Sequence, residues 1–250
     1  IAVSGPFGAV KEQSSGLYAQ TMAERGFLTL AFDPSYTGES GGEPRNVASP
    51  DINTEDFSAA VDFLIAHPNV DAKRIGIIGI CGFGGMGLNA AAMDTRIKAT
   101  VASTMYDMSR VNANGYFDAE DSAEVRRNKR EAMNAIRTRD AQNGTATPGT
   151  PGLPTSIKGD EPQFVKDYFD YYKTERAFHA RAINSNGAWN PTMALSFINM
   201  PLLTYIHEID NAVLLIHGEN AHSRYFSEDA FKRLKGNNKE LLIVPGANHT

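Results

Sequence analysis

The chain has 250 residues, a formal net charge of −5 and a single cysteine. Its 42% hydrophobic and 21% charged residues are ordinary for a globular protein, which excludes disorder and collagen-like repeats. One cysteine excludes an internal disulfide framework and a zinc site made of cysteines. The acidic balance argues against a nucleic-acid-binding face, and no apolar run approaches the roughly 18 residues that span a bilayer. We therefore expect a soluble globular protein.

Strand and helix patterns alternate along the first hundred residues. Apolar runs predict strands at 1–4, 27–32, 75–80 and 97–103. Helical spacing and small residues predict helices at about 15–25, after a cap at Asn53, and at about 84–93. Both ends look cut, because the chain has no initiator methionine and stops one residue after a histidine. Leading strands or a signal peptide would then lie upstream.

The alternation lapses between about 107 and 189, where charged, Pro/Gly/Thr-rich and aromatic stretches follow one another. We expect a mostly helical cap inserted at about 108–190. The alternation resumes with strands at 213–217 and 240–244 around a helix at about 227–234. This repetition predicts an α/β fold in one domain, 1–250, with a mostly parallel sheet and helices on both faces. Ligands of such sheets bind at the carboxyl ends of the strands.

The single cysteine stands in the most specific motif of the chain, Gly79-Ile80-Cys81-Gly82-Phe83-Gly84-Gly85. A tight turn from strand to helix strains the central residue and exposes its side chain, and the glycines leave room for it. The following helix N-terminus should favour a thiolate and lower the pKa of Cys81. The alternative is an inert buried thiol beside glycines that only let the helix pack on the strand.

With this motif the chain resembles the α/β-hydrolase superfamily, and within it the dienelactone-hydrolase-like branch, which has cysteine at the nucleophile elbow. The resemblance covers nearly the whole chain; its segments are Ser4-Gly5-Pro6-Phe7-Gly8, Gly38-Glu39-Ser40-Gly41-Gly42, the elbow, Leu215-Ile216-His217-Gly218-Glu219 and Pro245-Gly246-Ala247-Asn248-His249. One departure is Phe83, which stands where the G-x-S-x-G spacing has its last glycine. The resemblance implies an α/β-hydrolase fold with Cys81 as the nucleophile.

His249 follows the last visible strand, where this fold carries its general base, and the order nucleophile then histidine agrees with the fold. A histidine on a surface loop is the alternative. The family's acid follows the strand at 213–217 in a Gly-x-x-Asp pattern, which falls here on Ala221. Glu219 and Asp107 are the two candidate replacements. Glu219 could instead bind loop amides, and Asp107 could instead cap a helix.

An oxyanion hole needs two N–H donors aimed at one point. In this fold the residue after the nucleophile, Gly82, supplies one, and the loop after Ser4 supplies the other. Pro6 has no N–H, so Phe7 is the candidate; a simple tight turn is the alternative. Three residues are candidates for contacting the substrate, with a solvated loop or cap packing as the alternative: Arg224, His222 and Trp189.

We expect a hydrolase that cleaves small esters, lactones or thioesters through a Cys81 acyl-enzyme, with no cofactor and no metal. The resemblance favours small, anionic substrates, for which Arg224 would be the partner. The alternatives are a peptidase of the same fold, or a catalytically retired hydrolase that binds a ligand or senses redox state through Cys81. The expected partner is a small molecule and neither nucleic acid nor membrane. A cytoplasmic location is expected, and the oligomeric state is open, a homodimer included.

Overall fold

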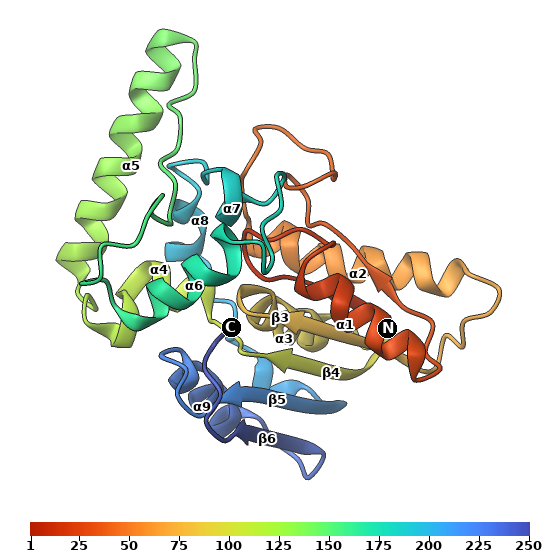
Figure 1. The fold of residues 1–250 in the computed structure, drawn as a ribbon. Helices are drawn as coiled ribbons and strands as arrows, with labels where there is room; N and C mark the ends of the chain where they lie inside the picture. The colour runs from red at the N-terminus through yellow and green to blue at the C-terminus, as the bar shows by residue number, and fades with distance from the viewer.

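The computed structural model of the protein describes residues 1–250 and contains one six-stranded sheet, all of whose strand pairs are parallel. The strand order is β2-β1-β3-β4-β5-β6 (Figure 1). The predicted α/β class is therefore confirmed. The strands are β1 (Ala2–Ser4), β2 (Leu30–Ala31), β3 (Ile75–Ile80), β4 (Ile97–Ser103), β5 (Ala212–Gly218) and β6 (Lys239–Val244).

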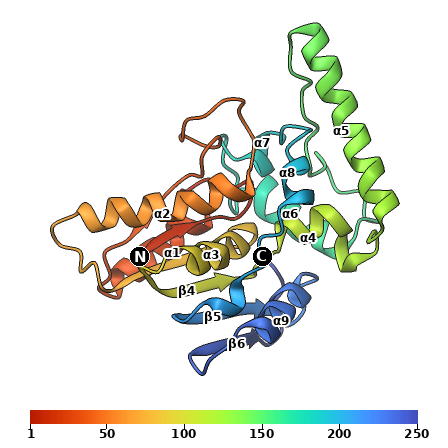
Figure 2. The same ribbon diagram turned by 180° about the vertical axis from the view of Figure 1, so that it is seen from behind.

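Four longer helices connect these strands and pack on the two faces of the sheet. They are α1 (Ser14–Glu24), α2 (Pro50–Ala66), α3 (Gly82–Met93) and α9 (Arg224–Arg233). Helix α1 covers one face, and α2, α3 and α9 cover the other (Figures 1 and 2). The main core of 26 buried residues lies on the side of α2, α3 and α9, and a smaller cluster of four lies under α1. This division places helices on both faces, as the alternation predicts.

A long helical segment separates β4 from β5. It contains α4 (Met108–Asn114), the 3₁₀ turn η1 (Tyr116–Asp118), α5 (Ala123–Asn143), α6 (Gln163–Lys173), α7 (Ile183–Asn186), α8 (Ala194–Asn199) and η2 (Ile206–Glu208). Helix α5 projects away from the sheet in Figure 1, and only Met133 of its residues is buried. Helices α4, α6 and α7 lie over the carboxyl ends of the strands (Figure 1). No helix of the protein is long and apolar enough to cross a membrane.

The direction in which strands are added reverses at β1. From β1 the chain moves outward to β2, and it then returns to the other side of β1 to form β3. Ser4 at the end of β1 pairs with Gly79 near the end of β3. In parallel sheets, ligands bind at the carboxyl ends of strands where the order reverses in this way. The loops after β1 and β3 therefore flank the expected binding position.

Two local predictions need correction. Helix α2 begins at Pro50 and is capped by Ser49, whose hydroxyl accepts from the Ile52 N–H; Asn53 lies in the first turn and accepts from the Ser49 N–H at 2.9 Å. Strand β2 has only two residues, Leu30 and Ala31, and the preceding Phe27 and Leu28 are exposed and lie outside the strand. The apolar run predicts a longer strand, at 27–32.

Gly79 is a steric requirement of the fold. A Cβ atom there would lie 2.1 Å from the carbonyl oxygen of Phe83, which is backbone and cannot move aside without distorting the turn. We predict that Gly79→Ala lowers the free energy of unfolding by about 1–3 kcal/mol or more, measured by urea denaturation. Gly41→Ala, where a Cβ meets nothing within 4 Å, is the matched control and should change stability by less than about 0.5 kcal/mol. Equal stability of the two variants would contradict this account.

Candidate functional site

Cys81 occupies a strained turn between β3 and α3. Its φ of 56° and ψ of −124° lie where residues with a side chain seldom occur. The backbone holds this geometry through three hydrogen bonds: the Cys81 N–H donates to Ser103 O, and its carbonyl accepts from the N–H groups of Gly84 and Tyr106, each at 2.9 Å. This is the backbone geometry expected of a nucleophile elbow, and it directs the thiol away from the sheet.

Phe83 fits this elbow because its ring points into the core. The side chain is 1% exposed, and its ring centroid lies 6.3 Å from that of Phe57. The close approach between helix and neighbouring chain occurs one residue later, where a Cβ on Gly84 would lie 2.5 Å from the Cβ of Met105. The departure from the G-x-S-x-G spacing therefore leaves the turn intact.

The thiol of Cys81 lies in an environment that disfavours its charge. Burial raises its pKa to about 11, and hydrogen bonds from the backbone N–H groups of Phe7 and Gly82 oppose this rise. This corrects the expectation of a lowered pKa, since desolvation outweighs the helix N-terminus here. The two N–H groups at the sulfur are those predicted as oxyanion donors. At neutral pH the resting group is a thiol.

The loop that carries the Phe7 N–H is held by residues of the helical segment. Asn184 of α7 donates from its side chain to Phe7 O at 2.8 Å, and its backbone N–H donates to Gly8 O at 3.0 Å. The ring of Trp189 packs on Phe7 with centroids 4.3 Å apart. These contacts fix the position of one donor relative to the thiol. Trp189 thus packs on the loop after β1 and lines the cavity beside Cys81.

Cys81 opens into an apolar cavity of about 360 Å³. No lysine, arginine, aspartate or glutamate lines it, so the cavity has no partner for a charged ligand group. The hydroxyls of Tyr106 and Tyr168, 2.9 Å apart, are among its few polar groups. The lining residues are Phe7, Cys81, Tyr106, Met108, Val111, Tyr116, Gly152, Leu153, Phe164, Val165, Tyr168, Tyr172, Asn184 and Trp189.

His249 lies at the same end of the sheet, among rings that reach the Cys81 cavity. Its ring centroid is 5.1 Å from that of Tyr106 and 5.3 Å from that of Tyr168. Burial lowers its pKa well below the usual value, so the imidazole is neutral. No hydrogen bond joins His249 to the sulfur of Cys81 in this structure. Catalytic hydrogen bonds are often long in structures without substrate and shorten when substrate binds.

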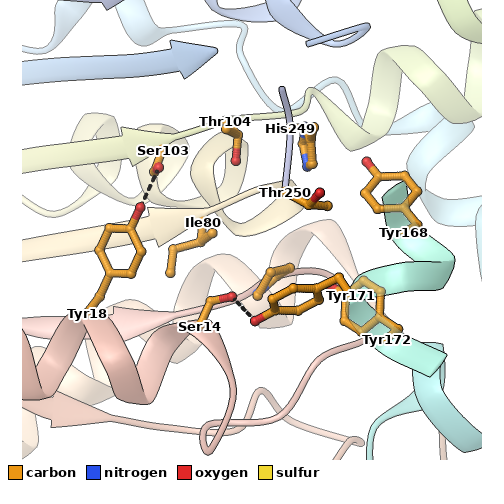
Figure 3. A pocket seen from close by; sticks show the side chains of 11 residues that line it. Ser14, Tyr18, Ile80, Ser103, Thr104, Tyr168, Tyr171, Tyr172, His249 and Thr250 are labelled. Atoms are coloured by element: carbon orange, nitrogen blue, oxygen red, sulfur yellow. Dashed lines mark hydrogen bonds between the residues drawn. The ribbon is translucent and has the colours of Figure 1, made fainter. Parts of the chain in front are cut away.

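A second cavity has a volume of about 150 Å³ and is shown in Figure 3. His249 lines it opposite Tyr168, Tyr171 and Tyr172 of α6, and the hydroxyl end of Tyr168 points toward His249. Tyr168 and Tyr172 of α6 line both cavities, whereas His249 lines this one alone and Cys81 lines the other alone.

Neither predicted acid is hydrogen bonded to His249. The Glu219 carboxylate accepts from the Gly246 N–H at 2.8 Å, and the Asp107 carboxylate caps α4 by accepting from Arg110 N at 3.0 Å. Glu219 therefore binds a loop amide and Asp107 caps a helix, as the alternative interpretation of each residue predicts. This corrects the predicted orienting acid.

The partner of His249 is a serine. His249 Nδ1 and Ser223 Oγ are 2.7 Å apart, and Ser223 Oγ is 2.9 Å from Nε2 of His217. His217 Nδ1 in turn lies 2.7 Å from Ser227 Oγ. His217, Ser223 and Ser227 are fully buried. The sequence contains one signal for this series of hydrogen bonds. Ser223 and Ser227 stand six and ten residues after His217, on the segment that should carry the acid.

Two of the predicted substrate contacts lie elsewhere. The guanidinium of Arg224 donates to Glu219 O and pairs with Glu228 at 3.0 Å, and Arg224 does not line the cavity. His222 binds the hydroxyl of Tyr106 and stacks on Phe164 with ring centroids 4.3 Å apart. His222 thus supports two residues of the cavity wall from behind. No group of three His, Cys, Asp or Glu side chains converges as a metal site would require.

Comparison with known sequences identifies the family. A sequence model of the X-Pro dipeptidyl-peptidase (S15) family matches residues 2–250. The chain is 63% identical over 250 residues to the uncharacterized protein PA2218 of Pseudomonas aeruginosa, of whose length it spans 66%. It is 35% identical over 257 residues to the uncharacterized protein YcjY of Escherichia coli, of which it spans 80%. A shorter match, 35% over 96 residues, covers 38% of this chain and 30% of the thiohydrolase aneE of Aspergillus aculeatus.

Solved structures show the same fold. The crystal structure of PA2218 superposes with a TM-score of 0.94 over 99% of this chain and 76% of the other. The α/β-hydrolase GrgF from Penicillium sp. sh18 superposes with a TM-score of 0.79 at 21% identity, over 99% of this chain and 81% of the other. The second likeness concerns the fold alone, and it confirms the predicted α/β-hydrolase fold.

The raised pKa of the thiol predicts slow alkylation at neutral pH. The iodoacetamide reaction rate of folded Cys81 should keep rising with pH to above about 10, because only the thiolate reacts. The same chain unfolded in urea is the control, since its only thiol should titrate near the free value of about 8.5. The rate is measured by intact-protein mass spectrometry. A folded-state rate that levels off below pH 8.5 would contradict the desolvated thiol.

Proposed function

This chain belongs to the X-Pro dipeptidyl-peptidase (S15) family of α/β-hydrolases, and we propose that it hydrolyses apolar esters or thioesters through an acyl-enzyme on Cys81. The observation that carries the proposal is the position of the thiol. It stands at the elbow, with the Phe7 and Gly82 N–H groups beside it and an apolar cavity in front of it. A carbonyl carbon bound at the sulfur would have its oxygen next to two N–H donors.

In the first half-reaction His249 Nε2 takes the thiol proton as the Cys81 sulfur attacks the carbonyl carbon. The C=O bond becomes a C–O⁻ single bond, and the N–H groups of Phe7 and Gly82 stabilise that oxyanion. The carbonyl reforms as the alkoxide or thiolate leaves, and the imidazolium protonates it. Concerted proton transfer suits a thiol whose pKa is raised, because a free thiolate would be scarce.

In the second half-reaction His249 removes a proton from water, and the resulting hydroxide adds to the acyl carbon. Collapse of the second tetrahedral intermediate breaks the C–S bond, releases the carboxylic acid and returns the proton to Cys81. Both steps require His249 Nε2 to reach the sulfur or a single bridging water, at about 2.6–3.2 Å. Movement of α6 side chains would open that path, because Tyr168 and Tyr172 line both cavities.

The acyl group that fits this cavity is uncharged and apolar. Aromatic and aliphatic side chains form nearly all of its wall, and Arg224, the predicted partner of an anionic substrate, is paired with Glu228 instead. We therefore replace the anionic substrate of the dienelactone-hydrolase-like resemblance with a neutral acyl chain. The partial likeness to a protein named thiohydrolase supports thioesters as one form of the substrate.

Peptide hydrolysis, which the family description suggests, has less support from the cavity. A dipeptidyl-peptidase must bind the charged amino terminus of its substrate, for which a carboxylate or a ring of carbonyls is the usual partner. No aspartate or glutamate lines the Cys81 cavity. Expelling an amine also requires a well-positioned proton donor, and His249 has no carboxylate to stabilise its protonated form.

A ligand-binding protein without turnover is the second candidate. Two observations favour it: burial raises the pKa of the Cys81 thiol, and no hydrogen bond joins the sulfur to His249. In that case an apolar ligand would bind in the cavity unchanged and Cys81 would not be acylated. The next experiment separates the two functions, because only acyl transfer changes the mass of the protein.

We predict that incubation with p-nitrophenyl hexanoate releases p-nitrophenol and transiently adds one hexanoyl group to the protein. Intact-protein mass spectrometry after acid quenching detects the adduct, and peptide mapping places it on Cys81. Cys81→Ala should abolish both adduct and turnover, whereas Cys81→Ser, of similar size, should keep the fold and lose most of the rate. Xaa-Pro p-nitroanilides serve as peptide controls and should not be cleaved. Turnover that persists in Cys81→Ala would contradict the proposal.

The cavity predicts a preference for long, neutral acyl chains. Each buried methylene contributes about 0.8 kcal/mol, and a hexanoyl group has four more methylenes than an acetyl group, so kcat/KM for the hexanoyl ester should exceed that for the acetyl ester by between about tenfold and about 200-fold. A p-nitrophenyl hemisuccinate should be cleaved at least about tenfold more slowly than the neutral ester of matching length, because its carboxylate would lose water without gaining a partner. Steady-state rates measure both ratios. Equal or better turnover of the hemisuccinate would contradict the neutral substrate class.

A further inference from the structure

We propose that Ser223 and His217 take the place of the orienting acid, forming an uncharged hydrogen-bond relay that fixes the tautomer of His249. The inference rests on the proposed function for its meaning in catalysis, but its structural part can be tested alone. It starts from the three contacts of the relay: His249 Nδ1 to Ser223 Oγ at 2.7 Å, Ser223 Oγ to His217 Nε2 at 2.9 Å, and His217 Nδ1 to Ser227 Oγ at 2.7 Å.

The number of protons that each group can donate fixes the direction of the hydrogen bonds in the relay. His249 can act as a base through Nε2 only if its Nδ1 carries the proton and donates to Ser223 Oγ. The Ser223 hydroxyl then donates to His217 Nε2, which must be unprotonated, and His217 Nδ1–H donates to Ser227 Oγ. Ser223 and His217 each donate once and accept once, between His249 as the first donor and Ser227 as the last acceptor, so the three contacts form without any charge. The reversed direction would place a proton on His249 Nε2 and remove its basicity toward the thiol.

The helix cap at the start of α9 shows that the Ser223 hydroxyl is committed to this relay. Serine at a helix N-cap usually accepts a hydrogen bond from a backbone N–H of the first turn. Ser223 is the N-cap of α9, yet its side chain makes no capping bond. Its hydroxyl instead lies between the two imidazoles, and the residue is fully buried. The helix thus lacks a side-chain cap, while the position carries a serine suited to one.

No charged group faces His249 in place of an acid. The titratable groups against its ring are Tyr106 after β4, Tyr168 of α6, His217 of β5 and His222 of the loop before α9. Burial lowers the pKa of His217 to about 4, so both imidazoles of the relay are neutral at working pH. His249 and the Cys81 thiol are then both neutral, and the cavity beside Cys81 also has no ionised side chain in its wall. The relay orients the imidazole of His249. A carboxylate in its place would orient the imidazole and also stabilise its protonated form through charge.

Two substitutions at Ser223 test the relay. Ser223→Ala removes the acceptor for His249 Nδ1–H and should lower kcat/KM for p-nitrophenyl hexanoate by at least about tenfold, since a histidine in the wrong tautomer is a poor base. Ser223→Asp restores an acceptor and adds a charge that stabilises the imidazolium. Its activity should recover, and the acid limb of its pH profile should move to higher pH, because a base with a raised pKa is lost at a higher pH as the solution is acidified. Ser15→Ala, at a buried serine without a hydrogen-bond partner, is the control and should behave as wild type.

A second pair of variants tests His217. Gln in His217→Gln can present a carbonyl oxygen to the Ser223 hydroxyl and should recover most of the activity that His217→Leu loses. ¹⁵N NMR of the histidine rings gives a readout independent of turnover: wild type should show His249 protonated at Nδ1, and Ser223→Ala should lose that preference.

The outcomes are distinguishable. His249 protonated at Nε2 in wild type, or an unchanged tautomer in Ser223→Ala, would overturn the relay even if Cys81 is acylated. Absence of the acyl adduct in wild type would overturn the proposed function and leave the tautomer result to decide the relay. A Ser223→Asp profile whose acid limb does not move would also contradict the assignment, because the carboxylate would then not be on His249.

Discussion

The positive φ of Cys81 is the constraint on which the site depends. It is possible only because Gly79 lets the Phe83 carbonyl approach the end of β3, and because Ser103 and Tyr106 of the neighbouring strand end bind the Cys81 backbone. The same turn aims the Gly82 N–H and the thiol toward the loop after β1. Since the strand order reverses between β1 and β3, that loop lies beside the elbow and can supply the second donor. Sheet topology and local strain therefore produce the site together.

The chemistry of the site is dominated by the absence of charge in a desolvated space. Burial raises the pKa of the thiol and lowers that of His249, so both partners are neutral in the resting protein. The cavity wall contains no ionised side chain, and hydroxyls and imidazoles connect the base to the protein behind it. Charge would appear only in the transition state, where preformed N–H donors are most effective in a medium of low polarity. This favours acyl groups that are themselves neutral.

The sequence predicted most of the fold because its strongest signals are local. The uniformly apolar run at Ile75–Ile80 and the glycines after it specify a buried strand and a tight turn, and β3 and β4 have the predicted bounds. Strand β2 was overestimated because apolar residues such as Phe27 can be exposed at a strand's start. The partner of His249 could not be predicted, since hydrogen bonds between His217, Ser223 and His249 depend on how α9 packs against β5. The pKa of Cys81 likewise depends on burial that only the packed structure defines.

The claim that Cys81 accepts the acyl group between the two N–H donors can be tested most directly by crystallography of a trapped intermediate. Crystals of the wild-type protein would be reacted with a hexanoyl thioester and frozen before the acyl group is hydrolysed. The account predicts electron density continuous with the Cys81 sulfur, the acyl oxygen within hydrogen-bond distance of the Phe7 and Gly82 N–H groups, and the chain along the apolar cavity. An acyl chain bound without a bond to sulfur, or with its oxygen directed away from both N–H groups, would contradict it.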